Sequence, residues 1–260
     1  MDNDLEPIAG EFSGKIVVIT GAAGIYGAQF ASRFARLGAR VFITDRSQEA
    51  LETVEVQLNA SGVELYAADL TSAHDLERLC NRVVERLGAP DVVISNAGIY
   101  PFGGLFDTSL DTFDDIFSVN VRAGFEITRR LASAMISERK TGSFLFVGSG
   151  SARVLRTNGL AYCASKRALE WLMKGIALEL GPHGIRANMI EPGFWVGSTL
   201  TSHPPDYIDA TISQIPLRRL PEAEEAADAA VFLSSMAAKY ITGVSVPVDG
   251  GVSIPHRRIA

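Results

Sequence analysis

The 260-residue chain lacks several features that mark other classes of protein. It has only two cysteines, Cys80 and Cys163, far apart and without His or Cys at metal-ligand spacing, which excludes a disulfide framework and a zinc site. Both are expected to be packing residues. An excess of positive charge is also missing, because 30 acidic residues against 24 Lys and Arg give a net charge of −6. That balance argues against a general affinity for nucleic acid or for an anionic membrane.

Long apolar runs are missing as well. No stretch approaches the roughly 18 consecutive apolar residues of a membrane-spanning helix. The acidic start, MDNDLEPIAGEFSG, has neither the basic region nor the apolar core of a secretory signal. We therefore expect a cytoplasmic protein, without a membrane segment or a metal, that acts on a small molecule. With no repeat, linker or low-complexity segment, 1–260 is expected to be one domain.

Short apolar runs rich in β-branched residues alternate with helical patterns along the chain. Runs without polar alternation are typical of strands that are covered on both faces, and alternation with helices favours a parallel sheet. The sequence predicts an α/β fold, a single-domain Rossmann-type doubly wound parallel sheet of seven strands flanked by helices. The expected strands are 15–20, 40–45, 63–69, 91–98, 143–149, 185–193 and 244–251, and the clearest helices are 26–37, 73–87, 111–137 and 161–180.

A glycine-rich turn, TGAAGIYG, follows the first expected strand and opens a helix. Free amide groups and the helix dipole at such a turn can hold the pyrophosphate of a dinucleotide, although a tight turn without a ligand is the alternative. Gly21 would make the turn, Gly24 would allow close approach, and Gly27 would let the helix pack on the sheet. The amides of Ile25 and Tyr26 would be donors. The Tyr26 phenol could bond the phosphates or wall the nicotinamide pocket.

Two carboxylates end the next two strands. Asp45 stands 18 residues after the glycine turn, where it could accept the adenosine ribose hydroxyls, which favours NAD. Arg46 follows and could accommodate a 2′-phosphate, which leaves NADP open. Alternatively, Asp45 could cap the helix after Ser47. Asp69 suits the amino group of adenine, or it could cap the following helix in competition with Thr71.

Tyr162 and Lys166 share one face of the expected helix 161–180. A phenol has an ordinary pKa near 10, and a nearby ammonium would lower it, so the pair suits acid–base catalysis. Ser149, at a strand end, could hold a substrate oxygen beside the phenol. Asn120 lies within 111–137, where its poor helix propensity indicates a kink or a buried water contact, unless it is merely exposed or capping.

These motifs occur in one order, with DL at 69–70, NAG at 96–98, PG at 192–193 and VDGG at 248–251. Together they resemble the short-chain dehydrogenase/reductase family in its branch of roughly 250 residues. The resemblance implies that Tyr162 is the general acid/base and that Lys166 lowers its pKa and binds the nicotinamide ribose. It also implies that Ser149 orients the reacting oxygen and that Asn120 anchors a water and Lys166 in a proton relay.

The same resemblance implies hydride transfer between NAD, or NADP, and an alcohol or ketone, in a homotetramer or homodimer paired through 111–137 and 161–180. Three positions depart from the family pattern: Ile25 stands where a glycine is usual, Gly197 where a threonine is usual, and Ser95 where an asparagine is frequent. The further implied cofactor-binding residues are Asn96, Ala97 and Gly98 on the adenosine side, Pro192, Gly193 and Trp195 beside the nicotinamide, and Leu70 next to Asp69.

The expected substrate pocket is apolar. Tyr100, Leu155 and Phe194 are its candidate residues, and 194–216 is expected to form a lid. Arg153 and Arg156 flank the site and could hold a carboxylate, or could simply be solvated. The sequence favours an NAD-dependent dehydrogenase of a cyclic or aryl secondary alcohol. The alternatives are an NADPH-dependent ketone reductase, including the 3-oxoacyl type, and a non-catalytic dinucleotide-binding sensor.

Overall fold

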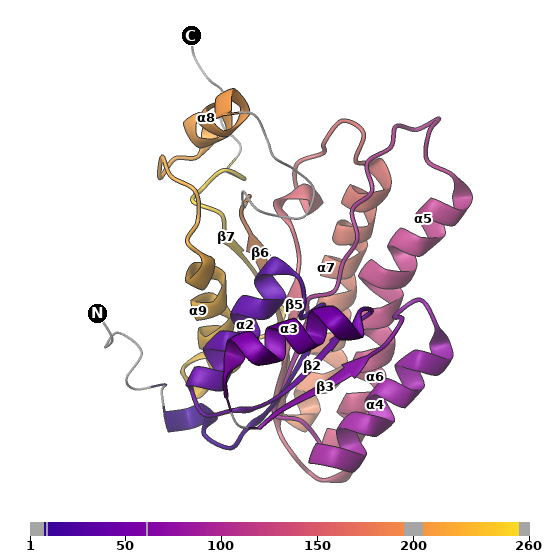
Figure 1. Cartoon of the computed structure of the whole chain (residues 1–260), viewed down its shortest axis with the longest axis vertical. Helices are drawn as coiled ribbons and strands as arrows, with labels where there is room; N and C mark the ends of the chain where they lie inside the picture. Colours follow the sequence, from indigo (N-terminus) through magenta and orange to yellow (C-terminus); the bar gives the residue numbers. More distant parts are fainter. Residues whose placement is uncertain (1–7, 9, 61, 195–204, 255–260) are drawn as a thin grey trace.

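The computed structural model describes residues 8, 10–60, 62–194 and 205–254. Its centre is a seven-stranded parallel sheet with the order β3-β2-β1-β4-β5-β6-β7 (Figure 1). The order reverses between β1 and β4, which places a crevice for a ligand at their carboxyl ends. The predicted α/β doubly wound fold is confirmed. The strands are β1 Ile16–Thr20, β2 Arg40–Asp45, β3 Val63–Ala67, β4 Val92–Ser95, β5 Gly142–Val147, β6 Ile185–Pro192 and β7 Ser245–Val248.

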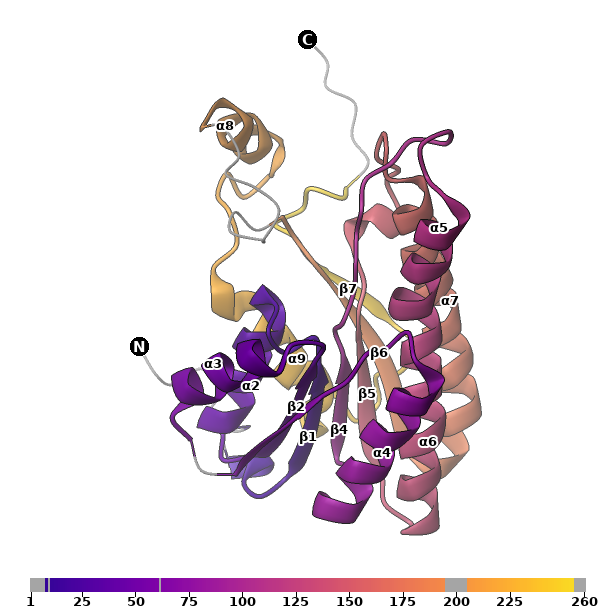
Figure 2. The ribbon, with the colours of Figure 1, turned by 45° about the vertical axis from the view of Figure 1, so that its right-hand side comes forward.

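Helices cover both faces of the sheet, as Figure 2 shows. One hydrophobic core lies between the sheet and α2, α3 and α9, and the other between the sheet and α4, α6 and α7. Cys80 and Cys163 are buried and unpaired. The helices are α2 Ile25–Arg36, α3 Gln48–Leu58, α4 Ala73–Leu87, α5 Leu110–Phe117, α6 Ala123–Ser137, α7 Leu160–Leu180, α8 Pro205–Gln214 and α9 Ala223–Ser234. Within the described part of the chain, no helix combines the length and apolarity needed to cross a membrane.

Several strands end earlier than predicted because their last residues bond elsewhere. The expected strand 91–98 ends at Ser95. Beyond it, the amides of Asn96 and Ala97 donate to the Thr20 hydroxyl, at 3.0 and 3.1 Å, instead of joining the ladder. The expected strands 63–69, 143–149 and 244–251 end at Ala67, Val147 and Val248. The residues beyond each strand are thereby free to build loops at the ligand edge.

The predicted helix 111–137 is interrupted, as the Asn120 position indicated. A short π-helical segment, Ser118–Arg122, separates α5 from α6. Such segments arise where the regular hydrogen-bond ladder is disturbed, and they often occur at functional sites. Asn120 lies within it and is buried, so its side chain points inward from the irregular turn.

Candidate active site

The glycine turn connects β1 to α2 at the carboxyl edge of the sheet. Gly21 has φ +63°, and a Cβ there would lie 2.7 Å from the Ala97 Cα. A Cβ at Gly27 would lie 2.1 Å from the Gly21 carbonyl oxygen. Both positions therefore require glycine, one for the left-handed turn and one for the close packing of the helix. Gly24 is exposed and adopts an extended conformation at the start of α2.

The start of α2 differs from the starts of its neighbours. Ser47, Ser72 and Ser109 cap α3, α4 and α5 by accepting a backbone amide. Within the described residues, α2 has no such side-chain cap, and its first turn holds no acidic residue. The positive end of this helix and its amides are thus left for an anion at the edge where β1 ends. This arrangement fits the pyrophosphate of a dinucleotide.

Asp45 is half-buried beside this turn at the end of β2. Its carboxylate accepts from the Ala23 amide at 3.1 Å and from the Arg46 amide at 2.8 Å. Because Ser47 caps α3, accepting from Ala50 at 3.2 Å, the capping alternative for Asp45 is wrong. The carboxylate instead joins β2 to the glycine turn, where it fits a ribose. The Arg46 side chain is exposed.

Asp69 closes its own loop. One carboxylate oxygen accepts from both the amide and the hydroxyl of Thr71, each at 2.8 Å. Ser72 caps α4, so neither Asp69 nor Thr71 does so. The Leu70 side chain is buried in the core, which leaves its main chain as the part that could face a nucleotide. Contact of Asp69 with adenine stays a prediction.

Thr20 is a structural residue to which sequence reasoning gave no role. Its buried hydroxyl accepts from the amides that follow β4, and the Asn96 side-chain amide donates to the carbonyls of Thr20 and Gly21 at 3.0 and 2.9 Å. These bonds fix the two loops that flank the crevice. The available signal was a polar residue, Thr20, at the end of a buried strand and directly before the first glycine of the turn. Gly98, two residues after Asn96, is exposed, and a Cβ there would lie 3.3 Å from Lys166 Nζ.

The predicted catalytic residues Ser149, Tyr162 and Lys166 come together where β5 ends and α7 begins. Lys166 is 4% exposed, and its ammonium donates to the Val147 carbonyl at 3.0 Å. Its Nζ lies 5.8 Å from the centre of the Tyr162 ring. Burial lowers the pKa of Lys166 to about 8, since the charged form is desolvated. The Ser149 hydroxyl, two residues beyond β5, interacts with the Tyr162 phenol and lowers its pKa.

Burial raises the pKa of Tyr162 above its ordinary value, while the hydrogen bond with Ser149 and the charge of Arg156 lower it. The net direction is opposite to the one predicted from the tyrosine–lysine spacing, because desolvation outweighs the favourable contacts. Tyr162 therefore stays a protonated donor at neutral pH, held close to the hydroxyl of Ser149. This geometry suits delivery of a proton to a substrate oxygen.

Asn120 holds the loop beside Lys166. Its side-chain oxygen accepts from the Ile99 amide at 2.8 Å, and its amide donates to the Ile99 carbonyl at 2.9 Å and to the Ser165 hydroxyl at 3.0 Å. A Cβ at Gly98 would lie 3.4 Å from the Asn120 side-chain oxygen. The π-helical turn thus positions the Asn120 side-chain amide so that it holds the loop after β4 through Ile99. A relay through a bound water stays a prediction.

Tyr26 reaches across the crevice to the end of β6. Its phenol donates to the Gly193 carbonyl at 2.7 Å, and its ring stacks on Phe30 with centres 6.4 Å apart. Burial raises the pKa of Tyr26, so the phenol remains a donor. Gly193 in turn packs on the β7 end, where a Cβ would lie 2.9 Å from the Asp249 Cα. Pro192 ends β6, and Trp195 lies outside the described residues.

Two loops beside Tyr162 are joined to each other and carry exposed apolar side chains. The Gly103 amide donates to the Asn158 carbonyl at 2.8 Å, which joins the loop after β4 to the loop before α7. The Tyr100 and Tyr162 rings are 6.0 Å apart at 65°.

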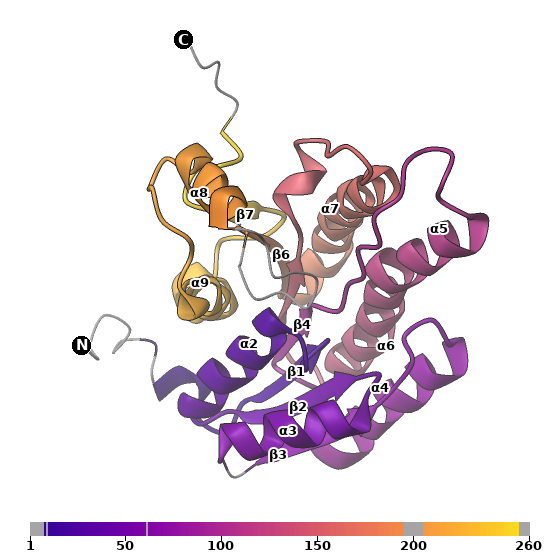
Figure 3. The ribbon, with the colours of Figure 1, turned by 45° about the horizontal axis from the view of Figure 1, so that its top comes forward.

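Phe194 is half-buried, and of the expected lid only Phe194 and residues from 205 onward are described. Figure 3 shows α8 beyond the ends of β6 and β7. Exposed apolar side chains on the two loops are Phe102, Leu105, Phe106, Val154 and Leu155.

Known proteins are similar to this chain over most of its length. A family model described as "Enoyl-(Acyl carrier protein) reductase" matches residues 21–253. "Short chain aldehyde dehydrogenase 1" of Euphorbia lathyris is 35% identical over 269 residues, covering 96% of this chain and 92% of its own. The "2,5-dichloro-2,5-cyclohexadiene-1,4-diol dehydrogenase LinX" of Sphingobium indicum is 33% identical over 249 residues, covering 95% and 99%. The solved structure "Pseudomonas aeruginosa RhlG/NADP active-site complex" superposes with a TM-score of 0.89 at 28% identity, covering 96% and 100%.

The fold and the site define an oxidoreductase that uses a nicotinamide dinucleotide. The chain belongs to the short-chain dehydrogenase/reductase family. As a member it is an NAD(P)-dependent alcohol dehydrogenase or carbonyl reductase that acts on small molecules.

Proposed function

We propose that the protein is an NAD-dependent dehydrogenase of apolar, cyclic or aryl secondary alcohols. The observation that carries the proposal is the meeting of Ser149, Tyr162 and buried Lys166 beside the uncapped start of α2. When bound, the nicotinamide would accept a hydride from the carbinol carbon or return it to the ketone.

The chain's own residues divide the remaining work. Ser149 donates a hydrogen bond to the substrate oxygen and fixes its position next to the phenol. Tyr162 gives its phenol proton to the substrate oxygen in reduction. In oxidation its phenolate form, which the Lys166 ammonium would favour, takes the alcohol proton. Lys166 places a positive charge beneath the phenol, held by the Val147 carbonyl, and reaches toward the nicotinamide ribose. Asn120 keeps the β4 loop against these groups through its bonds to Ile99.

The dinucleotide would lie along the strand ends from β2 to β6. Gly21, Gly24 and Gly27, with the amides of Ile25 and Tyr26, would hold the pyrophosphate. Asp45 would accept the ribose hydroxyls, and its charge would repel a 2′-phosphate, which supports NAD. The other residues of this site would be Arg46, Asp69, Leu70, Asn96, Ala97, Gly98, Pro192, Gly193 and Trp195.

NADPH-dependent reduction of ketones is the second candidate, favoured by the exposed Arg46 and by the NADP complex among the similar structures. The ratio of kcat/KM with NAD and with NADP decides between the two. A preference for NADP would overturn the role given to Asp45. In that case, Arg46→Ala should lose most of the preference if its guanidinium contacts the 2′-phosphate.

The substrate class is supported by two observations. The loops around Tyr162 expose large apolar side chains, with Phe106 95% and Leu155 77% exposed. A relative of similar length is named as a dehydrogenase of a cyclic diol. An apolar wall with one polar catalytic end is the usual form of a pocket for such a ligand. Tyr100, Leu155 and Phe194 would contact the ring.

The test is a panel of cyclic, aryl and acyl-chain alcohols and ketones, followed at 340 nm with both cofactors in both directions. On the best substrate, Tyr162→Phe should reduce turnover at saturating cofactor by about 100-fold or more. Tyr240→Phe is the matched control, because Tyr240 is fully exposed. Turnover of Tyr162→Phe within threefold of wild type would contradict the assignment. Nucleotide binding without turnover of any compound would favour the dinucleotide-binding sensor.

The same family leads us to propose a homotetramer, or at least a homodimer, paired through α5, α6 and α7. These helices expose Phe125, Trp171 and Leu178, and they border a surface groove of about 600 Å³. Light scattering of the purified protein measures the assembly, and Leu178→Glu should weaken it. The two unpaired cysteines fit the reducing cytoplasm, where we place the activity.

A further inference from the structure

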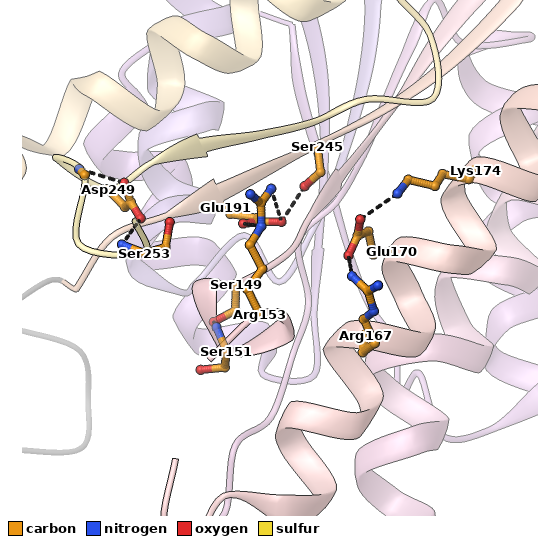
Figure 4. Close-up of polar contacts among 11 residues, drawn as sticks. Ser149, Ser151, Arg153, Arg167, Glu170, Lys174, Glu191, Ser245, Asp249 and Ser253 are labelled. Carbon is orange, nitrogen blue, oxygen red and sulfur yellow. Dashed lines mark hydrogen bonds and ion pairs between the residues drawn. The ribbon is translucent and has the colours of Figure 1, made fainter. Parts of the chain in front are cut away.

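A buried carboxylate lies at the end of β6, two residues before Gly193. The Glu191 side chain is 1% exposed. Arg153 contacts it with two nitrogens, Nε at 3.0 Å and Nη2 at 3.2 Å, and the Ser245 hydroxyl donates to it at 2.5 Å. Figure 4 shows this cluster beside Ser149. Arg153 therefore holds a carboxylate of the protein itself, and sequence reasoning gave Glu191 no role.

The pair joins the turn that carries Ser149 to the neighbouring strand. Ser149 begins the 3-10 turn Gly150–Ala152, with its hydroxyl accepting from the Ser151 amide at 3.1 Å. Arg153 ends the turn, donating its amide to Gly150 at 3.0 Å. The turn is only one helical turn long, so the Arg153 side chain fixes the end opposite to Ser149.

The other end of the turn rests directly on β6. A Cβ at Gly148 would lie 2.5 Å from the Met189 sulfur and 3.2 Å from Glu191 Cγ. The main chain that leads into Ser149 thus packs on Glu191 at one point, and Arg153 binds the carboxylate of the same residue at another. Two attachments to one strand leave the turn little freedom to shift along β6.

Charge makes this attachment obligatory. A carboxylate at 1% exposure is strongly unfavourable without a partner, and removal of one member of a buried pair leaves an uncompensated charge. Glu170 offers a contrast, since its partners Arg167 and Lys174 lie on its own helix α7 (Figure 4). The Arg153–Glu191 pair instead joins two elements that are 38 residues apart in sequence.

We propose that Arg153 and Glu191 are positioning residues that hold the Ser149 hydroxyl against Tyr162. The proposal rests on the catalytic role proposed for Ser149. A reacting group misplaced by about 1 Å can lose up to about 100-fold in rate. Loss of the pair should therefore reduce kcat by about 10- to 100-fold. The Kd of the nucleotide should stay within threefold, because Asp45 and the glycine turn, which would hold the adenosine ribose and the pyrophosphate, follow β2 and β1, and only Pro192 and Gly193 of the nucleotide site adjoin Glu191.

The kinetic test compares wild type with Glu191→Gln, Arg153→Met, the double variant and Arg153→Lys on the best substrate of the panel. Each single variant should lower kcat as stated, Arg153→Lys should recover part of it, and the double variant should lose much less than the product of the single losses. The control is Asp228→Asn, which removes a 2.7 Å ion pair to Arg33 between α2 and α9. Values of kcat within threefold of wild type in both single variants, or multiplicative losses, would overturn the proposal.

A second readout does not depend on turnover. The amides of Ala152, Arg153 and Val154 bond to Ser149 or Gly150 within the turn. Their hydrogen exchange, followed by mass spectrometry of peptides spanning 149–154, should speed up at least tenfold in Glu191→Gln and Arg153→Met, but not in Asp228→Asn. Unchanged exchange would overturn the proposal even if wild type turned over no compound. If exchange changed as expected but wild type turned over no compound, the proposed function would be refuted and this proposal would not.

Discussion

Tyr26→Phe separates two roles that a phenol in the glycine turn could have. The substitution removes the hydroxyl that donates to the Gly193 carbonyl at 2.7 Å and keeps the ring stacked on Phe30. A hydrogen bond of this kind contributes about 1 kcal/mol net. For a chain of this size, that loss corresponds to a fall in Tm of roughly 2–4 °C.

The substitution should change the affinity for the nucleotide little. In the structure the phenol proton is already committed to Gly193, so Tyr26 would wall the pocket with its ring. We expect the Kd of NAD for Tyr26→Phe to stay within about threefold of wild type, measured by isothermal titration calorimetry. Tyr240→Phe, at a fully exposed position, controls for the loss of a phenol. A tenfold or greater loss of affinity, without the fall in Tm, would refute the reasoning and assign the phenol to the phosphates.

Three further predictions follow from buried contacts. Burial lowers the Lys166 pKa from 10.5 to about 8, so between these two pH values only the unfolded chain keeps the proton. The free energy of unfolding of wild type should therefore rise by about 3 kcal/mol relative to that of Lys166→Met as the pH is raised from below 8 to 10.5. Parallel pH profiles of the two unfolding free energies, measured in urea, would contradict this. Asn120→Ala should cost about 2–4 kcal/mol in urea unfolding by stranding both Ile99 groups. Gly27→Ala should weaken NAD binding tenfold or more, whereas Gly175→Ala, where the added Cβ would meet no described atom within 4 Å apart from the neighbouring backbone of its own helix, should not.

The fold was largely predictable from the sequence because burial on both faces leaves a strong local pattern. Runs such as KIVVIT and RVFITD have few polar residues, and the structure makes them β1 and β2. The strand ends were less predictable. The predicted strand 91–98 included Asn96 and Ala97, but their amides bond to Thr20, on a strand that lies 76 residues before Asn96. A competing partner so far along the chain has no local signature.

The site divides in the same way. Tyr162 and Lys166 were predictable as a pair because helical spacing places them on one face. The direction of the Tyr162 pKa was not, since burial, the dominant cause, depends on loops that pack over the residue. Glu191 escaped prediction for a related reason. A glutamate at the end of a buried strand suggests no chemistry until Arg153, 38 residues away, is placed beside it.

A common pattern underlies most of these contacts. Side chains of Thr20, Asn120, Lys166 and Tyr26 each bond to the main chain of another element, at Ala97, Ile99, Val147 and Gly193 respectively. A main-chain partner is the same whatever its side chain, so the sequence records only one half of each contact. The polar half is restricted to residues that can make the bond, whereas Ile99 or Val147 needs only to pack. Motifs in such a site are therefore short and scattered, because each marks a side chain whose partner is fixed in position. Partners such as Ile99 and Val147 can vary in identity, whereas Gly193 is restricted by its packing on Asp249.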